Sequence, residues 1–340
     1  MVKMKFVLAV FTAILIVGCA QTHQEEQVLE EQTVSYGEEE QIDTSPAYIE
    51  TVEIENIDIE EEVQVLEEVL PAVPILLETE ASGELEKRNE AVVIDYSNTS
   101  DGYVMVQYLK ENENRIKVQV KGEKITYTYN LPVQKWIVFP LSDGNGNYQV
   151  TVYENIGGNR YAMVLSESFI VELNDEFAPF IRPNQYVDYS EAESTIQTAA
   201  KLVTGIEDTI QKVEKVYDFV VGTISYDEEK ARSVKSGYLP VLDEVMETKK
   251  GICFDYAALM TGMLRSQGIP CKLVVGYAGS AYHAWIHVWT EENGWVDGII
   301  YFDSHSWHRM DPTFASSAGQ SEDIMEYIGD GTNYTEKYLY

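Results

Sequence analysis

The hydrophobic pattern of the chain changes its period twice, and each change separates parts that must fold differently. Apolar and polar residues alternate from residue 91 to about 173, as in the run 115–121. From about residue 190 apolar residues recur every three or four positions, and alternation returns after Pro270. Alternation is typical of half-buried strands, whereas the longer period is typical of amphipathic helices. The order therefore predicts an all-β part followed by an α+β part in which helices precede an antiparallel sheet.

The alternating part, residues 91–175, has the pattern of a small β-sandwich. Turn-forming clusters at 97–102, 111–114, 142–147 and 157–159 separate short strand-like runs. About seven such strands at this spacing predict an immunoglobulin-like sandwich. Its tyrosines and Trp136 could form a surface for a glycan or a peptide. Ordinary packing between neighbouring strands is the interpretation we prefer.

Residues 19–90 have the composition of a segment that does not fold. Glutamates cluster at 38–40 and 60–62, and Lys87 and Arg88 are the only basic residues. Such a stretch repels itself, so we expect a disordered acidic tether, most simply a solvated spacer. The formal net charge of the whole chain is −33. This charge excludes binding to nucleic acid through phosphate contacts.

Residues 1–18 have the pattern of a secretory signal. Lys3 and Lys5 precede the apolar run 6–17, which is too short for a membrane span. The run ends at Gly18-Cys19, a junction that resembles the bacterial lipobox, in which the cysteine becomes the lipidated first residue. We therefore expect an extracytoplasmic protein anchored to the membrane by lipid at Cys19. An ordinary signal peptide with an incidental cysteine is the alternative.

The helical part begins where Ser190 and Glu193 have the spacing of a capping box. Further along, Cys253 stands at the start of another amphipathic run. A thiol at a helix N-terminus lies at the positive end of the helix dipole, which favours the nucleophilic thiolate. A lone cysteine in this position is more often a packed residue.

Two later residues complete a catalytic pattern around that cysteine. His283 lies in an alternating run that places Trp285 and His287 on the same strand face. Asp311 follows in the next strand-like segment, before a proline. Cysteine at a helix start, histidine on one strand and aspartate on the next is the order a Cys-His-Asp relay needs. His283 would accept the thiol proton, and Asp311 would orient the imidazole.

Five short motifs carry a resemblance to a known family. They are Gly251-Ile-Cys-Phe-Asp-Tyr-Ala, Leu264-Arg-Ser-Gln-Gly-Ile-Pro, Val275-Gly-Tyr, His283-Ala-Trp and Asp311-Pro-Thr. In order and spacing they resemble the transglutaminase-like superfamily over roughly residues 190–315. The resemblance implies a papain-like fold, which we assign to 180–340. It also implies Cys253 as nucleophile, His283 as general base and acid, and Asp311 as the orienting carboxylate.

Three further residues are expected beside the site, namely Trp285, His287 and Tyr256. The family often has a glutamate where this chain has His287. His287 either alters the pH response of the site or is a half-buried strand residue, which we prefer. The family often has alanine where this chain has Cys271. A disulfide with Cys253 would remove the nucleophile, so we expect Cys271 to be a small buried residue.

The resemblance also implies a reaction. Family members include amide cross-linkers, cysteine proteases and peptide amidases, which form a thioester on the cysteine. We expect hydrolysis of a protein or peptide substrate at the cell surface, with cell-wall peptides among the candidates. A cross-linking transglutaminase and a non-catalytic binding or scaffold module are the alternatives. The sequence shows no zinc pattern and no phosphate-binding glycine loop, so we expect neither metal nor cofactor.

Overall fold

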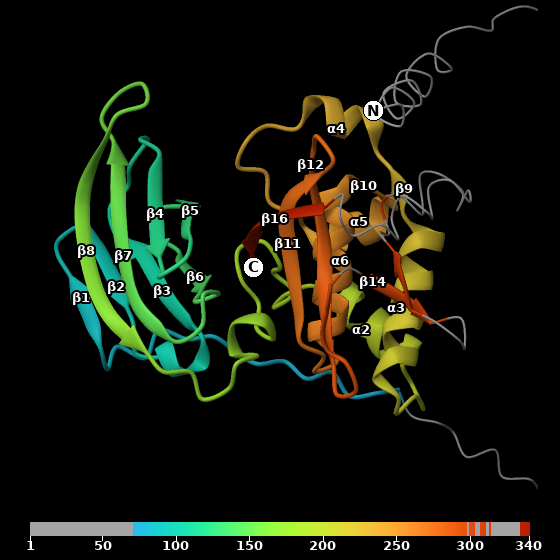
Figure 1. The fold of residues 1–340 in the computed structure, drawn as a ribbon. Coiled ribbons are helices and arrows are strands. Elements are labelled where there is room, and N and C mark those ends of the chain that lie inside the picture. Colours follow the sequence, from blue (N-terminus) through green and yellow to red (C-terminus); the bar gives the residue numbers. More distant parts are fainter. Residues whose placement is uncertain (1–70, 298, 303–306, 311–312, 314–333) are drawn as a thin grey trace, which may run out of the picture. The chain divides into compact units, whose positions relative to one another are not determined.

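Two four-stranded antiparallel sheets occupy the part of the chain where residues alternate (Figure 1). The computed structural model describes residues 71–297, 299–302, 307–310, 313 and 334–340, all within one compact unit. The first sheet has the order β1-β2-β3-β6, with strands Glu86–Arg88, Val92–Asp95, Tyr103–Tyr108 and Trp136–Pro140. The second has the order β5-β4-β7-β8, with strands Thr126–Leu131, Ile116–Lys121, Gly146–Asn155 and Tyr161–Val171.

Alternation along the strands decides which side chains fill the core. In β4, Val118 and Val120 are fully buried, and in β5 Tyr127 and Tyr129 are buried while Thr128 between them is exposed. Val118 faces Tyr129 across the antiparallel pair. Burial of such apolar side chains contributes about 25 cal/mol per Å² of covered surface. Strands therefore form where alternation predicted them, and the immunoglobulin-like topology stays a prediction.

The second part of the chain combines helices with a third sheet. The helices are α2 (Glu193–Leu202), α3 (Thr209–Thr223), α4 (Glu228–Ser233), α5 (Leu242–Thr248) and α6 (Cys253–Arg265). The third sheet has the order β13-β12-β11-β16, with strands Gly294–Asp297, Ala281–Thr290, Cys271–Ala278 and Tyr334–Leu339. Two pairs of short strands, β9 (Ser225–Tyr226) with β10 (Lys250–Gly251) and β14 (Ile299–Phe302) with β15 (Trp307–Met310), and two 3₁₀ turns, Thr99–Asp101 and Ala178–Phe180, complete the described elements.

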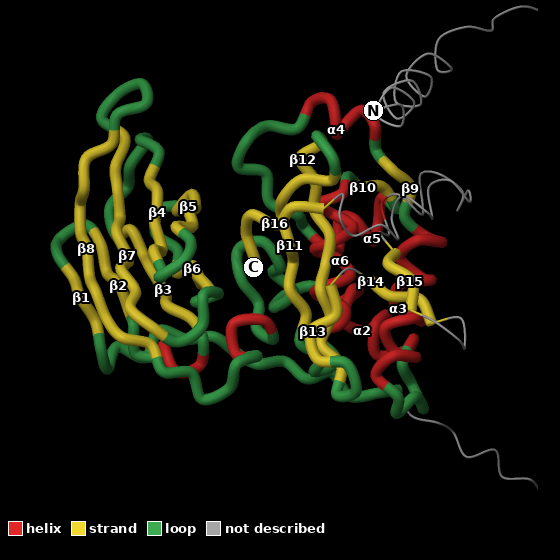
Figure 2. The backbone as a smooth tube through the Cα atoms, viewed as in Figure 1, coloured by secondary structure: helices red, strands yellow, loops and turns green. Residues whose placement is uncertain are grey.

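Helix α6 lies at the centre of this second part (Figure 2). It packs against β11 and β12 on one side and against α2, α3 and α5 on others. Every residue from Asp255 to Arg265 is buried, so the helix is covered all round. Mixed α and β structure with helices packed on an antiparallel sheet is the class that the periodicity predicted.

A buried arginine fixes the end of α6. The Arg265 guanidinium donates to the backbone oxygen of Cys271 from Nε at 2.9 Å and from Nη2 at 2.7 Å. It also donates to the backbone oxygens of Tyr340 and Arg182, both at 2.8 Å. Gly268 then turns the chain with a φ of 75°, a conformation that favours glycine. The helix end, the start of β11 and two distant segments are thus joined by one side chain.

The folded part begins earlier than the predicted tether boundary at residue 90. The Ala72 N–H donates to Thr204 Oγ1 at 3.2 Å, and the Ile75 N–H donates to the Ser266 oxygen at 2.7 Å. Residues Glu86–Arg88 form strand β1. The prediction was wrong for 71–90 because backbone groups there bond to distant elements that composition does not reveal. Residues 1–70, with Cys19, lie outside the described residues.

The start of α2 also differs from the prediction. The helix begins at Glu193 without a capping bond from its own N-cap residue. The N–H groups of Ser194 and Thr195 donate instead to the carboxylate of Asp243, at 3.0 and 2.9 Å. Ser190 bonds to Asp188. A carboxylate from α5 therefore satisfies the free N–H groups that Ser190 was expected to cap.

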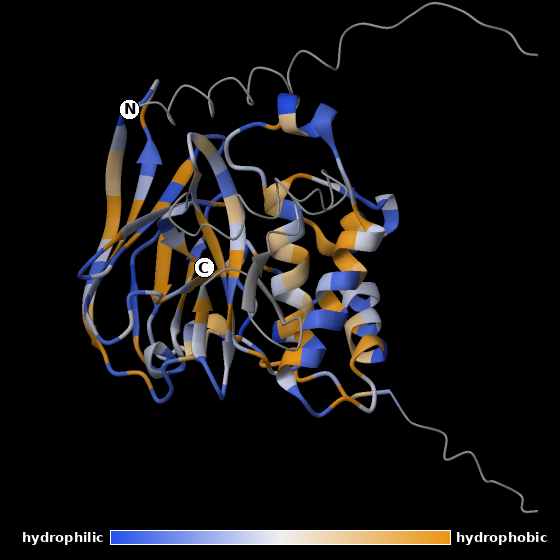
Figure 3. Ribbon diagram, turned by 45° about the vertical axis from the view of Figure 1, so that its right-hand side comes forward, coloured by the Kyte–Doolittle hydropathy of each residue, from blue (hydrophilic) through white to orange (hydrophobic). Residues whose placement is uncertain are grey.

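Hydrophobic residues of the described part are found on both its strands and its helices (Figure 3). Figure 3 shows hydrophobic and hydrophilic stretches interspersed along the strands and helices. Within the described ranges no helix is both long enough and apolar enough to cross a membrane.

Candidate active site

Cys253 is the first residue of α6, as predicted. The preceding residue, Ile252, has extended backbone, and its N–H donates to Asp255 Oδ2 at 2.8 Å. Asp255 is fully buried. A carboxylate in this position satisfies a free N–H and complements the positive end of the helix dipole. The thiol is thereby held at a rigid helix start.

A polar cluster around the buried Asp255 connects this helix start to the preceding loop. Lys230 Nζ lies 2.8 Å from Asp255 Oδ2. The Tyr238 hydroxyl donates to Asp255 Oδ1 at 2.5 Å and accepts from Lys230 Nζ at 2.6 Å. Burial, and after it the Asp255 carboxylate, raises the pKa of Tyr238, so the hydroxyl keeps its proton. We call Lys230, Tyr238 and Asp255 the anchor cluster.

His283 lies on β12, on the strand face that the alternation predicted. Its ring stacks beside Trp285 with centroids 6.2 Å apart, and the Trp285 indole Nε1 donates to His287 Nε2 at 3.3 Å. The opposite face carries Ala284 and Ile286, which belong to the hydrophobic core that also contains α6. One face of β12 thus packs in the core, and the other face carries His283, Trp285 and His287.

Gly276 of β11 allows β16 and the Trp285 ring to lie close to the backbone of β11. A Cβ atom at Gly276 would lie 2.1 Å from the Thr335 oxygen and 2.8 Å from Trp285 Cη2. Both distances are too short for any side chain. The glycine of the Val-Gly-Tyr motif is therefore required where β16 and the Trp285 ring meet β11.

His287 is more deeply buried than the half-buried position we preferred, with 3 % of its surface exposed. Its Nε2 lies 3.1 Å from Glu336 Oε1 as well as near the Trp285 indole. His287 Nε2 can accept a hydrogen bond from the Trp285 indole N–H, or, when it bears a proton, it can donate one to Glu336. Since Glu336 belongs to β16, His287 ties the last strand to β12.

A cavity of about 540 Å³ brings Cys253 and His283 together, because both side chains line it. Six tyrosines and one phenylalanine are among its eighteen described lining residues, which also include one exposed lysine, Lys235. None of its described lining residues is Asp or Glu. The lining residues are Thr128, Tyr186, Tyr226, Ala231, Val234, Lys235, Ser236, Gly237, Tyr238, Ile252, Cys253, Phe254, Val275, Tyr282, His283, Ala284, Tyr338 and Tyr340.

None of the six tyrosines that line the cavity was anticipated from the sequence, and two of them, Tyr226 and Tyr282, interact electrostatically with Cys253. Burial raises the pKa of Tyr226, and a negative charge on Cys253 raises it further. Burial is also the main cause that raises the pKa of Tyr282, where Cys253 contributes after Tyr338 and Tyr277. Both hydroxyls therefore remain protonated near the thiol. Tyr282 adjoins His283, which was a usable signal, whereas nothing local marks Tyr226.

The remaining predicted site residues lie elsewhere. Tyr256 is buried in the core, and its hydroxyl donates to the Ile224 oxygen at 2.7 Å. Trp285 is buried beside His283 but does not line the cavity. Asp311 lies outside the described residues.

Cys271 and Cys253 are both free thiols, so no disulfide joins them. Cys271 is fully buried, and burial raises the pKa of its thiol to about 12. The prediction of a small buried residue is confirmed. Within the described part of the chain, no group of three His, Cys, Asp or Glu side chains is arranged to hold a metal ion.

The region that contains Cys253 and His283 is similar in sequence to known proteins. Residues 196–298, which include Cys253 and His283, match the model of the Transglutaminase-like superfamily. This region is a transglutaminase-like domain. The uncharacterized protein YebA of Bacillus subtilis is 27% identical over 170 residues, 44% of this chain and 22% of that protein. A protein-glutamine gamma-glutamyltransferase of Pseudomonas aeruginosa is 29% identical over 98 residues, 25% of this chain and 13% of that protein.

These curated relatives are much longer than the matched region, which spans less than a quarter of either. Among solved structures, a putative cysteine protease from Cytophaga hutchinsonii aligns with a TM-score of 0.37 at 15% identity, over 75% of this chain and 73% of that one. The periplasmic domain of TgpA from Pseudomonas aeruginosa aligns with a TM-score of 0.30 at 15% identity, over 74% and 81%.

Proposed function

We propose that the transglutaminase-like domain is a cysteine-dependent enzyme that hydrolyses amide bonds in a protein or peptide substrate. The observation that carries the proposal is that Cys253 and His283 line one cavity, with the thiol at a helix N-terminus. A thiol and an imidazole in one cleft are the two groups that acyl transfer through a thioester requires.

The reaction divides into two steps. Cys253 Sγ attacks the carbonyl carbon of the amide after His283 takes the thiol proton, and His283 then protonates the departing amine as the C–N bond breaks. Water, deprotonated by His283, attacks the thioester and releases the acid. Asp311 would orient the imidazole in both steps. The oxyanion that forms in each step would bind the backbone N–H of Cys253, because helix N-termini present free donors.

Tyr226 is our candidate for the side-chain donor to that oxyanion. It lines the cavity, its pKa responds to charge on Cys253, and its hydroxyl remains protonated. A neutral hydroxyl close to the thiol can donate to negative charge that develops beside it.

Transfer to an amine is the second candidate, because one relative bears the name protein-glutamine gamma-glutamyltransferase. We favour hydrolysis because a free amine is a cation at neutral pH. The described lining of the cavity offers it Lys235 and no carboxylate. A protonated amine therefore gains no electrostatic attraction from these walls.

Peptide hydrolysis and amine incorporation can be tested side by side. We expect the full chain to release new amino termini from a mixed casein digest, and to incorporate little dansylcadaverine. Cys253→Ala should lower either activity at least about a thousandfold, because the nucleophile is lost. Cys271→Ala is the matched control and should keep the activity. Equal activity of the Cys253→Ala and unchanged chains would overturn the assignment of the nucleophile, and absence of both activities from the unchanged chain would support a scaffold role instead.

We also propose that the protein is extracytoplasmic and held to the membrane by lipid on Cys19. The support is the basic start, apolar run and Gly-Cys junction of the sequence. In a bacterial host, the unchanged chain should partition into the detergent phase of Triton X-114, and Cys19→Ser should move it to the aqueous phase. Detergent partition of both would argue against the lipid.

A further inference from the structure

The loop between α4 and α5 forms one wall of the cavity that contains Cys253 and His283. Residues 234–237 are exposed and line this cavity together with Tyr238. We call residues 234–238 the wall loop. Because its side chains are open to solvent and face the cavity, they are accessible to a substrate that binds at the thiol.

The wall loop is fixed between α6 and β5. The Tyr238 hydroxyl donates to Asp255 of α6, and the Tyr238 N–H donates to the Lys235 oxygen at 3.2 Å, which closes a turn. Gly237 lies against β5, because a Cβ atom there would be only 2.5 Å from Asn130 Nδ2. Its φ of 89° also favours glycine. The backbone of Lys235 is therefore held in one place on the wall.

Lys235 carries a charge that the described chain does not neutralise. Its ammonium group forms no ion pair and no hydrogen bond with any residue that the structure describes. The nearby Lys230, in contrast, lies 2.8 Å from the Asp255 carboxylate. Apart from Cys253 and His283, Lys235 is the residue of the described lining that is ionised at neutral pH. The wall loop thus presents an uncompensated positive charge to the cavity.

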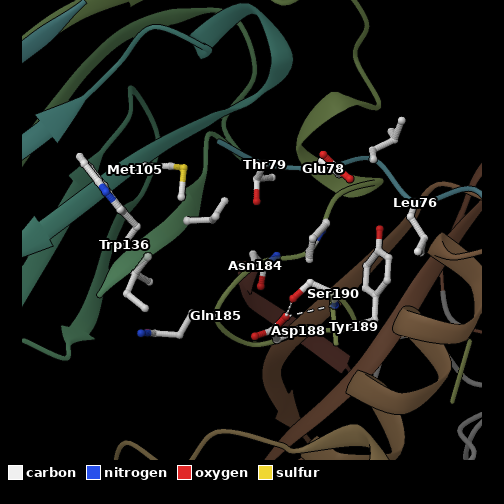
Figure 4. A pocket seen from close by; sticks show the side chains of 14 residues that line it. Leu76, Glu78, Thr79, Met105, Trp136, Asn184, Gln185, Asp188, Tyr189 and Ser190 are labelled. Carbon is white, nitrogen blue, oxygen red and sulfur yellow. Dashed lines mark hydrogen bonds between the residues drawn. The ribbon is translucent and has the colours of Figure 1, made fainter. Parts of the chain in front are cut away.

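Such a charge is unusual in a chain with a formal net charge of −33. A second cavity, between the segment 76–79, strands β3 and β6 and the loop 183–190, is lined by Glu78 and Asp188 and by no described Lys, Arg or His (Figure 4). Exposed charges more than about 8 Å apart are largely screened at physiological ionic strength. The charge of the cavity wall, more than that of the whole chain, therefore decides which ionic groups are attracted to the active site.

Hydroxyl groups add hydrogen-bond donors to this wall. Ser236 follows Lys235 in the wall loop, and Tyr282 lines the same cavity and is 60 % exposed. Neither hydroxyl bonds to a residue in the described part of the chain. A carboxylate accepts from ammonium and hydroxyl groups alike, and hydrogen bonds to an ionised acceptor are the stronger ones. The lining therefore matches an anionic oxygen group better than a cationic one.

We propose that Lys235 is a specificity-determining residue that selects peptides with a carboxylate near the scissile amide. This role rests on the function proposed above, because the carboxylate would bind the wall loop while Cys253 attacks the amide. The carboxylate is supplied either by an acidic side chain or by the free C-terminus of the peptide, since both present the same two oxygens. A neutral amide in its place gains no ion pair, and an ammonium group is repelled.

Three digests of dephosphorylated casein test this preference on the full chain. The first keeps its carboxylates, and the second is converted to methylamides after digestion and has none. In the third, the side chains are converted before digestion, so that only C-terminal carboxylates are free. Mass spectrometry follows the appearance of new amino termini with time. We expect cleavage of the first digest to be about fivefold faster than that of the second, the effect of one partly exposed ion pair.

The third digest identifies which carboxylate is recognised. Cleavage as fast as that of the first digest would assign the C-terminal carboxylate. Cleavage as slow as that of the second would assign an acidic side chain. Both results support the proposal, whereas equal cleavage of the first and second digests would overturn it.

Variants assign the preference to the Lys235 side chain. The ratio of the two cleavage rates is compared within each variant, so that a general loss of activity does not enter. The ratio should fall from about five to about one in Lys235→Gln and below one in Lys235→Glu. Lys215→Gln is the matched control and should keep the ratio, because Lys215 is exposed on α3 and lies outside the cavity. An unchanged ratio in Lys235→Gln that is folded by circular dichroism would overturn the assignment.

Binding separates this inference from the proposed hydrolysis. Immobilised Cys253→Ala chain should retain more of the first digest than of the second. The difference should shrink when Lys235→Gln is added, and also in about 0.5 M sodium chloride, because salt screens exposed charges. Selective retention without cleavage by the unchanged chain would overturn the hydrolysis and leave Lys235 as a binding residue. Cleavage without a carboxylate preference would overturn this inference alone, and neither retention nor cleavage of any digest would overturn both.

Discussion

At the scale of single residues, the two described cysteines differ in exposure and in chemistry. Cys253 lines a cavity, whereas Cys271 is fully buried and its thiol pKa is raised to about 12. Alkylation requires the thiolate. We therefore expect iodoacetamide to modify the cavity-lining Cys253 at pH 8 and to leave Cys271 unmodified until the pH approaches 12. Mass spectrometry of peptides after timed labelling measures both rates.

The same labelling tests the pairing of Cys253 with His283. If the imidazole takes the thiol proton, His283→Ala should slow alkylation of Cys253 at pH 6 and change it little at pH 9. Labelling in guanidinium chloride is the control, since unfolding should make both cysteines equally reactive. Similar alkylation rates for Cys253 and Cys271 in the folded chain would contradict the burial of Cys271 that the structure shows.

Tyr226 allows a second test at this scale. If its hydroxyl donates to the oxyanion, Tyr226→Phe should lower kcat about a hundredfold and leave KM almost unchanged, because the bond forms only in the transition state. Tyr282→Phe is the matched control on the same cavity, and because Tyr282 is the more exposed residue its hydroxyl should matter less. Steady-state kinetics on the peptide substrate would decide, and equal losses in both variants would remove the assignment.

At the scale of elements, the anchor cluster holds α4, its following loop and α6 together. Lys230→Met would leave the Asp255 carboxylate buried without its cation. Breaking such a pair from one side destabilises by about 3 kcal/mol. Urea unfolding should show a lower midpoint with a similar m-value.

The neighbouring Arg232 provides the control for this prediction. Its ion pair with Glu228 is exposed on both sides, and such pairs contribute less than about 1 kcal/mol. Arg232→Met should therefore change the midpoint little. If Lys230→Met were equally mild, the ion pair between Lys230 and Asp255 would contribute no net stability, and the prediction would fail.

At the scale of the whole described molecule, a cluster of tyrosines joins the second sheet to the transglutaminase-like domain. The Tyr340 ring lies 4.4 Å from that of Tyr186, 5.6 Å from Tyr127 and 5.8 Å from Tyr129, measured between centroids. Thr128 of the same strand lines the cavity of Cys253. Strand β5 of the second sheet therefore contributes to the candidate active site.

The cluster makes the fold sensitive to alkali. Burial raises the pKa of Tyr186 to about 12 and also raises that of Tyr127. Because the folded-state pKa values exceed the unfolded value of about 10, the unfolded chain loses these protons first. The contribution of the tyrosines to stability is fully present below pH 10 and falls as the pH rises toward 12. Cys271 adds to this loss from about pH 9 upward.

Urea midpoints at pH 8, 9.5 and 11 would measure this dependence. The midpoint should fall steadily across the series, and Tyr186→Phe should fall less steeply because one titrating group is gone. A flat profile for the unchanged chain would mean that the tyrosine rings are accessible to water.

Local features of the sequence determined much of the candidate site. The start of α6 at Cys253 and the shared face of His283, Trp285 and His287 follow from periodicities of three to four and of two. Each depends only on neighbours along the chain, so a single sequence reveals it. The buried position of Cys271 was expected because a disulfide with Cys253 would have removed the nucleophile.

Tertiary structure alone decided what surrounds these residues. Ala72 bonds to Thr204 across 132 positions, and Asp243 caps α2 in place of the nearby Ser190. Tyr226 and Thr128 reach the cavity from a short strand and from the second sheet. The local sequence pattern assigns a side chain to one face of a helix or strand. Which residue of another element that side chain contacts depends on how the elements pack. This packing is set by the core of the whole molecule.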